Sequence, residues 1–319
     1  MAVLVGIDEA GFGPLLGPLV VSSCAFELPH NLRTADMWPL LRRSVGKTRK
    51  HLAGRLLIND SKKAYCRSLG ITHLQRTVLA ALWCLGKKPR TVADLLEQVS
   101  PNTINRLSAY PWYADLAEKH LHADTTDIQI AADVFARDLE NHRIRLLDLR
   151  SVCLDVAYYN RMISAVKNKA AVLFSATGTL IQSAFDDFAH NGLNVIADRQ
   201  GGRLRYCRQL LKMFEHLQLR IIDENSTASS YELSQPPRRM QLHFVVGADR
   251  KYLPASLASM VSKYLRELLV DSINRYFTRF SANLKPTAGY WKDGLRFVRR
   301  IKTELPHLAF ESDRLVRCR

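Results

Sequence analysis

Apolar residues gather into short runs along the first part of the chain, and each run ends at a turn or at polar groups. The segment 3–8, VLVGID, predicts a buried strand, and the segment 18–26, PLVVSSCAF, predicts a second one. The short connection GFGPLLG between them favours an antiparallel pair. After a basic stretch at 42–55, the apolar run LLIN leads into DSKK.

The remainder of the chain alternates between helical and strand-like patterns. Helical periodicity is typical of 71–85, 157–189, 254–277 and 294–302, and strand patterns occupy 143–155, 194–198, 218–224 and 241–246. The region 87–133 mixes turn-forming breaks with short amphipathic segments, which predicts an inserted helical subregion. Interleaved strands and helices predict the α/β class. We expect a catalytic domain over 1–280 and a C-terminal helical extension over 281–319.

The charge of the chain changes this picture most. Its 46 Lys and Arg residues outnumber 30 Asp and Glu residues, which gives a formal net charge of +16. Such a field attracts polyanions, and nucleic acid is the leading candidate; the alternative is a basic protein whose charge only keeps it soluble. The six cysteines are scattered without a CxxC pair, so a zinc site has little support.

The location of the protein is predicted from what the sequence lacks. The N-terminal segment has no basic region before its apolar run, which argues against a secretory signal. No uninterrupted apolar stretch is long enough for a transmembrane helix. We therefore expect a cytoplasmic protein with reduced thiols and no membrane partner.

Carboxylates follow two of the predicted strands directly. Asp8 and Glu9 end the first strand just before Gly11 and Gly13, and Asp198 ends the run NVIA. Adjacent side chains on a strand point to opposite faces, so both acids can serve one site only where the strand ends or bends. Hard cations such as Mg²⁺ prefer carboxylate oxygens. The alternative is that these acids are solvated caps of strand ends and turns.

A third group of charges lies on the helix predicted at 254–277. Lys263, Arg266 and Glu267 share one helical turn, which places Glu267 where it can reach a metal while Lys263 or Arg266 contacts phosphate. Charged residues at this spacing are more often a solvated helix face.

Three segments together resemble a known family. GIDEAGFGPLLGPLVVSS at 6–23, DSKK at 60–63 and ADRKYLPASLASMVSKYLRE at 248–267 are similar, in order and spacing, to the motifs of type 2 ribonucleases H, the ribonuclease HII family. The resemblance extends from residue 3 to about residue 280, and the region 87–133 is the main insertion relative to the family pattern. A lone DEAG would be a weak signal, whereas three elements in order are a strong one.

The resemblance implies a ribonuclease H-like fold, with a mixed and mainly five-stranded sheet flanked by helices. It implies an endonuclease that cuts the RNA strand of RNA–DNA hybrids, or embedded ribonucleotides in duplex DNA, and leaves 5′-phosphate and 3′-hydroxyl ends. The four carboxylates would be Asp8, Glu9, Asp198 and Glu267, holding two Mg²⁺ or Mn²⁺ ions. We expect the chain to act as a monomer.

The same resemblance implies a set of substrate contacts. The loop Gly11–Phe12–Gly13 would read the ribose 2′-hydroxyl, which distinguishes RNA from DNA. Lys62, Lys63 and Lys263 would bind backbone phosphates, Ser61 would be a further substrate-binding residue, and Tyr290 would stack on a sugar at the RNA–DNA junction.

The sequence departs from the family pattern at three positions. Phe12 replaces an arginine, Arg199 replaces a glycine, and Glu267 replaces an aspartate. Two other functions stay open at this point. One is a hybrid- or RNA-binding protein on the same fold that cuts weakly or not at all. The other is a nucleotide-phosphate hydrolase, which the chain supports poorly because it has no GxxxxGK[ST] motif.

Overall fold

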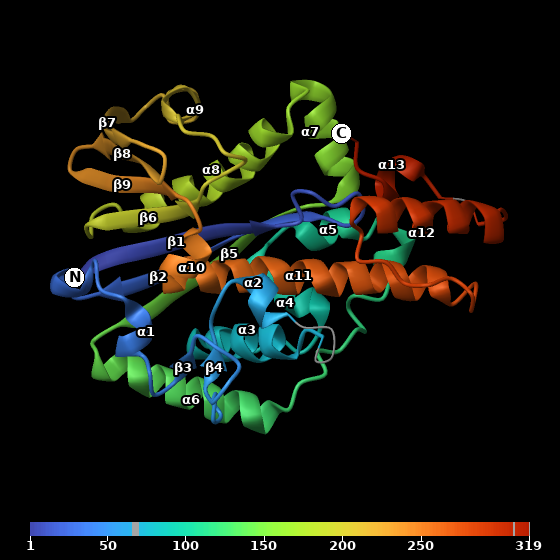
Figure 1. The fold of residues 1–319 in the computed structure, drawn as a ribbon, viewed down its shortest axis with the longest axis horizontal. Coiled ribbons are helices and arrows are strands. Elements are labelled where there is room, and N and C mark those ends of the chain that lie inside the picture. Colours follow the sequence, from blue (N-terminus) through green and yellow to red (C-terminus); the bar gives the residue numbers. More distant parts are fainter. Residues whose placement is uncertain (66–69, 309, 319) are drawn as a thin grey trace.

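The computed structural model describes residues 1–65, 70–308 and 310–318, and its centre is a mixed β-sheet (Figure 1). Within these residues the sheet has seven strands in the order β5-β2-β1-β6-β9-β8-β7. The strands are β1 Ala2–Ala10, β2 Leu19–Leu28, β5 Arg145–Leu154, β6 Leu193–Asp198, β7 Gln218–Glu224, β8 Ala228–Gln235 and β9 Arg238–Val245. β6 and β9 run parallel to β1, and the other neighbours pair antiparallel. The expected α/β class with a mixed central sheet is confirmed, with β8 and β7 extending it beyond five strands.

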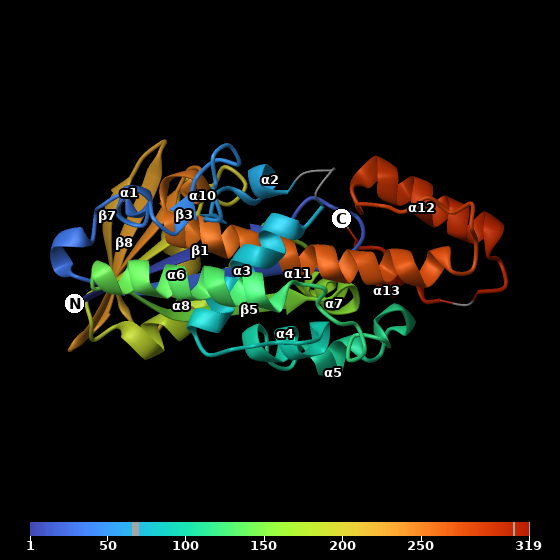
Figure 2. The ribbon, with the colours of Figure 1, turned by 90° about the horizontal axis from the view of Figure 1, so that it is seen from below.

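Helices cover both faces of this sheet. They are α1 Met37–Leu40, α2 Ser61–Ala64, α3 Thr72–Cys84, α4 Val92–Val99, α5 Thr103–Leu107, α6 Thr125–Asn141, α7 Val156–Val166, α8 Lys169–Phe188, α9 Cys207–Met213, α10 Ala248–Lys251, α11 Leu253–Thr278, α12 Trp291–Glu304 and α13 Ser312–Leu315, with 3-10 turns at His30–Leu32 and Pro111–Tyr113 and a short parallel pair of strands, β3 Val45–Gly46 and β4 Leu56–Leu57. Figures 1 and 2 show α8 against one face and α11 against the other, with α3 and α6 outside α11.

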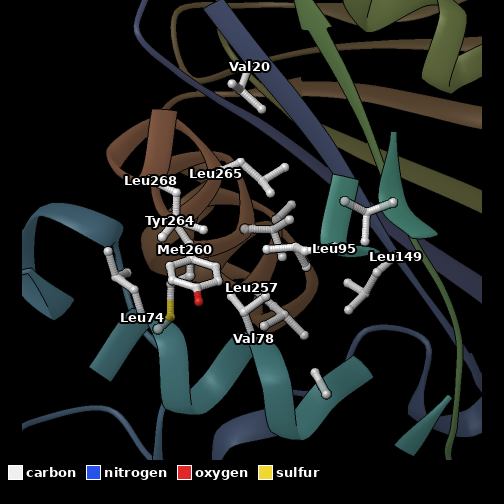
Figure 3. Close-up of a cluster of buried hydrophobic side chains, with 14 of the residues drawn as sticks. Val20, Leu74, Val78, Leu95, Leu149, Leu257, Met260, Tyr264, Leu265 and Leu268 are labelled. Carbon is white, nitrogen blue, oxygen red and sulfur yellow. The ribbon is translucent and has the colours of Figure 1, made fainter. Parts of the chain in front are cut away.

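The hydrophobic core between α11 and its neighbours explains why these segments are helical. Leu74 and Val78 of α3 meet Leu257, Met260 and Tyr264 of α11, and all five side chains are buried (Figure 3). Their spacings of three and four residues place them on one face of each helix. The periodic pattern at 71–85 and 254–277 therefore predicted both helices correctly.

The central strand β1 is buried on both faces, and a glycine sets how closely α11 approaches it. Val3, Val5 and Ile7 pack into the core on the α8 side. On the α11 side, a Cβ atom on Gly6 would lie 2.1 Å from the backbone nitrogen of Ala255. The absence of a side chain at Gly6 therefore allows the N-terminal turn of α11 to lie directly on β1.

The predicted helix over 157–189 is two helices. α7 ends at Lys167, which has a left-handed backbone with φ 50°, and the side chain of Asn168 accepts a hydrogen bond from the backbone N–H of Ala171 at 3.1 Å to begin α8. A left-handed residue followed by an N-cap terminates one helix and starts another. The apolar period continues across the break, so it concealed the turn.

The insertion and the C-terminal extension both pack on the second half of α11. From the insertion, the ring of Trp112 packs at a tilt against Phe277 with centroids 5.7 Å apart, and Lys119 donates a hydrogen bond to Asp271 at 2.8 Å. From the extension, Phe297 meets Phe277 edge-on at 5.8 Å. The boundary between a catalytic domain and an extension at residue 280 stays a prediction. No helix in the described part of the chain is long and apolar enough to cross a membrane.

Replacing Gly6 by Ala tests whether the close approach of α11 is required. Because the added Cβ would meet the backbone of Ala255 and Pro254 rather than a flexible side chain, we expect Gly6→Ala to lower the free energy of unfolding by about 3 kcal/mol or more. Gly13→Ala is the control, since a Cβ there meets nothing within 4 Å. Urea denaturation of both variants measures the difference. Equal stability of Gly6→Ala and the unmodified chain would contradict the packing described.

Candidate active site

The carboxyl ends of parallel strands bring acidic residues to one edge of the sheet. β1 and β6 are neighbours in parallel, with Ile7 opposite Ala197, so Asp8 and Asp198 leave adjacent strands side by side. Ligand sites in α/β sheets collect at such strand ends. The structure thus brings together Asp8, Glu9 and Asp198, as the sequence predicts.

The third parallel strand adds an acid that the sequence analysis did not select. β9 pairs with β6 and is followed by Gly247, whose left-handed backbone (φ +65°) turns the chain into α10. The backbone N–H of Ala248 donates a hydrogen bond to the Asp198 carboxylate at 2.8 Å. This contact holds the next residue, Asp249, beside Asp198.

The pKa shifts show how strongly these acids interact. Asp8 is only 7% exposed, and its pKa is raised well above its ordinary value by burial and then by the charges of Glu9 and Asp198. Burial and the charge of Asp198 raise the pKa of Glu9 to about 7. Burial, Asp60 and Asp198 raise the pKa of Asp249 to about 6. Asp249 in turn raises the pKa of both Asp8 and Glu9.

Glu267, the expected fourth acid, has a different environment. Its carboxylate accepts hydrogen bonds from Lys263 at 2.6 Å and from Arg266 at 3.1 Å. α11 contacts Asp8 through Ser259 and Ser262, and Glu267 lies eight residues beyond Ser259, about 12 Å along the helix. It is not among the charges that chiefly perturb the pKa of Asp8, Glu9 or Asp198.

The sequence contained a signal for Asp249. The run QLHFVV precedes it, just as apolar runs precede Asp8 and Asp198, and ADRKY opens the third motif of the resemblance. The missing knowledge was that β9 lies next to β6 and parallel to it. Asp249 and Glu267 belong to the same motif, and without knowledge of that strand pairing the sequence does not show which of the two acids lies at the site.

The glycine loop after β1 rests on two buried arginines. Gly11 has φ +94°, and a Cβ there would lie 2.6 Å from the carbonyl oxygen of Pro18 and 2.9 Å from the side chain of Arg266. Arg317, from the end of the chain, donates a hydrogen bond to the carbonyl oxygen of Gly11 at 2.5 Å. Both arginines are at most 3% exposed. These two side chains therefore pack under the loop on its buried side. Phe12 is half-buried against the core on the α8 side.

The other predicted substrate residues lie at several points around the acids. Lys62 is exposed on α2 and lowers the pKa of both Glu9 and Asp249, which places its charge near them. Ser61 is buried and accepts a hydrogen bond from Ser259 at 3.0 Å. Lys63 is exposed at the same helix.

Tyr290 lies beside the glycine loop. The carbonyl oxygen of Gly289 accepts hydrogen bonds from the backbone N–H groups of Leu15 and Leu16 at 2.7 and 3.1 Å, which joins the two segments. The Tyr290 ring is 51% exposed and lies 5.7 Å from the guanidinium of Arg266. The structure therefore brings Tyr290 and the loop together.

Two further side chains in this region are already engaged. Arg199, which replaces the family's glycine, donates hydrogen bonds to the carbonyl oxygens of Ser226 at 2.7 Å and Asn225 at 2.8 Å, in the turn between β7 and β8. Lys263 is bonded to Glu267 and lies over the ring of Tyr65 at 5.0 Å.

The donor atoms of the cluster suit a hard divalent cation. Among the residues that the structure describes, no three His, Cys, Asp or Glu side chains already converge on one point as the ligands of a bound ion do. Asp8, Glu9, Asp198 and Asp249 nevertheless offer only carboxylate oxygens, the ligands that Mg²⁺ and Mn²⁺ accept. Burial raises the pKa of all four acids, and repulsion by neighbouring carboxylates raises it further for Asp8, Glu9 and Asp249; a bound cation would offset that repulsion.

Comparisons with known proteins give structural neighbours only. No family model and no curated protein matches the chain. Among solved structures it is similar to ribonuclease HII of Archaeoglobus fulgidus in complex with PCNA, at TM-score 0.45 and 14% identity, covering 99% of this chain and 94% of that chain. It is similar to ribonuclease H2 of Pyrococcus horikoshii at TM-score 0.43 and 12% identity, covering 99% and 92%.

A third neighbour is ribonuclease H3 of Aquifex aeolicus, at TM-score 0.43 and 13% identity, covering 98% of this chain and 70% of that chain. All three neighbours are ribonucleases H. At these TM-scores and identities, the likeness by itself assigns neither activity nor substrate to this chain.

The burial of the acids, together with their repulsion, predicts an unusual pH dependence of stability. The folded-state pKa values of Glu9 (about 7) and Asp249 (about 6) exceed their ordinary values of 4.5 and 3.8. The folded state therefore holds protons that the unfolded state releases, and this stability is lost as pH rises from about 4 through about 7. In EDTA we expect the melting temperature to fall by roughly 5 °C from about pH 5 to about pH 8.

Asp249→Asn is the matched control for this measurement, because it removes one of the repelling charges. Its melting temperature should fall less over the same pH range, and Mg²⁺ at about pH 8 should stabilise the unmodified chain more than the variant. Identical pH profiles for the two proteins in EDTA would contradict the interaction between Asp249 and the other acids.

Proposed function

We propose that this chain is a divalent-cation-dependent nuclease of the ribonuclease H type, which hydrolyses the RNA strand or embedded ribonucleotides in RNA–DNA duplexes. The supporting observation is the cluster of Asp8, Glu9, Asp198 and Asp249 at the ends of parallel strands. Burial raises the pKa of all four acids, and the charge of Asp198 raises the pKa of the other three further. Carboxylates gathered against their own repulsion are the ligand set of metal-assisted phosphoryl transfer.

In this mechanism the protein holds the carboxylates in the orientation that would bind the metal ions. When bound, two Mg²⁺ or Mn²⁺ ions supply Lewis acidity toward the attacking water and the leaving 3′-oxygen, so cleavage leaves 5′-phosphate and 3′-hydroxyl ends. The Ser259 hydroxyl lies beside the Asp8 carboxylate and lowers its pKa, the Ser262 hydroxyl donates a hydrogen bond to the backbone carbonyl of Asp8, and the backbone N–H of Ala248 orients the Asp198 carboxylate. These hydrogen bonds fix the acids before substrate arrives, which lowers the reorganisation needed during reaction.

Substrate selection falls to the glycine loop and its neighbours. Phe12 has no hydrogen-bonding group, so the loop would contact the ribose 2′-hydroxyl through its backbone, with Tyr290 against the adjacent sugar. Lys62 and Lys63, exposed on α2, would bind phosphates. Ser61 would support them from its buried position. The net charge of +16 favours such a polyanionic partner.

Two substitutions distinguish the proposed metal ligands from the helix acid. We expect Asp249→Asn to lower kcat at least about 1000-fold, as Asp8→Asn should, because each removes a ligand of the ions that carry the chemistry. We expect Glu267→Gln to lower it less than about 10-fold, because Glu267 is paired with Lys263 and Arg266. The assay uses a labelled DNA duplex with one ribonucleotide beside a full RNA–DNA hybrid, in Mg²⁺, Mn²⁺ or EDTA.

The outcomes separate the possible functions. Cleavage that needs a metal ion and both Asp8 and Asp249 supports the proposal. An active Asp249→Asn variant together with an inactive Glu267→Gln variant would move the fourth ligand to Glu267. Tight, salt-sensitive binding without any cleavage by the unmodified chain would instead make it a hybrid- or RNA-binding protein.

A further inference from the structure

The segment 42–55, here called the basic loop, is the densest run of positive charge in the N-terminal half. Its side chains Arg42, Arg43, Lys47, Arg49 and Lys50 are exposed, and no Asp or Glu occurs between residues 37 and 59. Among the ion pairs of residues 1–65, 70–308 and 310–318, none involves these five cations. The Lys47 ammonium lies over the ring of Trp38, 3.9 Å from its centroid. The charges of the five cations are not neutralised by an acid, and they repel one another.

The basic loop has a defined structure. Its strand β3 pairs in parallel with β4, which directly follows the loop, and the hydroxyl of buried Ser44 donates a hydrogen bond to the Asp138 carboxylate at 2.7 Å. The Arg55 guanidinium donates to the carbonyl oxygens of Leu52 at 2.8 Å and Arg42 at 3.1 Å, so this arginine is used to close the loop. A segment fixed in this way presents its other cations on a surface with little further loss of entropy on binding.

The loop is tied directly to the candidate active site. The side-chain amide of Asn59 donates a hydrogen bond to the carbonyl oxygen of Lys47 at 2.5 Å. Asn59 is followed at once by Asp60, which raises the pKa of Asp249, and by α2. Figure 2 shows α2 and α12 on the same side of α11. A duplex that is seated at the acids and passes along α2 would lie next to the loop, because Asn59 joins the two segments.

We propose that the basic loop binds the sugar–phosphate backbone of the substrate duplex beyond the cleavage site, and so lengthens the footprint of the enzyme. This inference rests on the proposed function for the identity of the duplex. A row of exposed cations without acidic partners is complementary to a phosphate backbone, which carries one charge per roughly 1.7 Å of duplex axis. Such contacts add affinity without reading sequence.

The experiment compares two variants that each lower the net charge by two. Arg49→Gln/Lys50→Gln alters the basic loop. Arg137→Gln/Arg143→Gln is the control, because both residues are exposed and Arg143 lines the hollow with Met1 at the amino end of β1, opposite the acids. Fluorescence anisotropy in EDTA gives Kd for RNA–DNA hybrids of about 8 and about 24 base pairs at several salt concentrations.

The proposal predicts a result specific to position and length. The loop variant should bind the long hybrid about 10-fold more weakly at low salt, with a dependence of log K on log salt reduced by about 1 to 2, and should bind the short hybrid almost normally. The control should match the unmodified chain on both. Equal weakening by the two variants, or a loop variant with an unchanged salt slope, would overturn the proposal.

Binding in EDTA is measured without cleavage, so the two proposals fail separately. A chain that cuts no substrate but shows the position-specific salt effect would retain the basic loop as a binding surface and lose the nuclease assignment. If the chain cuts hybrids but the loop variant binds the long hybrid as the unmodified chain does, the nuclease assignment is retained and the basic loop is lost as a binding surface. Melting temperatures of both variants confirm that the substitutions leave the fold intact.

Discussion

The repulsion among Asp8, Glu9, Asp198 and Asp249 is the interaction around which this end of the molecule is built. Burial raises the pKa of each carboxyl, and the charges of neighbouring acids raise the pKa of Asp8, Glu9 and Asp249 further. Packing must hold such groups together, because they would separate if the strands were free to do so. The parallel order of β1, β6 and β9 supplies that constraint, since it directs three strand ends to one edge of the sheet.

The rest of the fold supports this edge from two sides. On one side, Gly6 allows α11 to lie directly on β1. Two serines of the same helix then contact Asp8: Ser262 donates a hydrogen bond to its backbone carbonyl, and Ser259 lowers the pKa of its side chain. On the other side, the glycine loop is held by Arg266 and by Arg317 from the opposite end of the chain. A loop fixed through its carbonyl oxygens leaves its amide groups to a ligand, which suits a position where Phe12 offers no polar atom.

The sequence predicted the elements that have a regular apolar face, and missed a strand that is mostly polar and a turn inside a continuous apolar pattern. Apolar runs and helical periods located β1, β2, α3 and α11, because each has a buried face with a regular spacing. The strand β8 was missed because ASSYELSQ is mostly polar, although its alternate residues Ser229, Tyr231 and Leu233 are buried. The turn at Lys167 was missed because the apolar period runs through it.

The candidate site shows the same division. Asp8, Glu9 and Asp198 were predicted because each directly follows an apolar strand before a glycine turn. Asp249 meets a similar criterion, but the family motif that contains it also contains Glu267. The parallel pairing of β9 with β6 and the hydrogen bond from Ala248 to Asp198 place Asp249, and not Glu267, beside Asp198. Strand order is a long-range property that one sequence does not carry in its local pattern.

A crystal structure grown with Mn²⁺ and measured for anomalous scattering tests the central claim most directly. The ion positions would identify the ligands without any assay of activity. We predict anomalous peaks bounded by carboxylate oxygens of Asp8, Glu9, Asp198 and Asp249, with Lys263 still bonded to Glu267. A peak coordinated by Glu267, or Mn²⁺ bound only elsewhere on the molecule, would contradict the account.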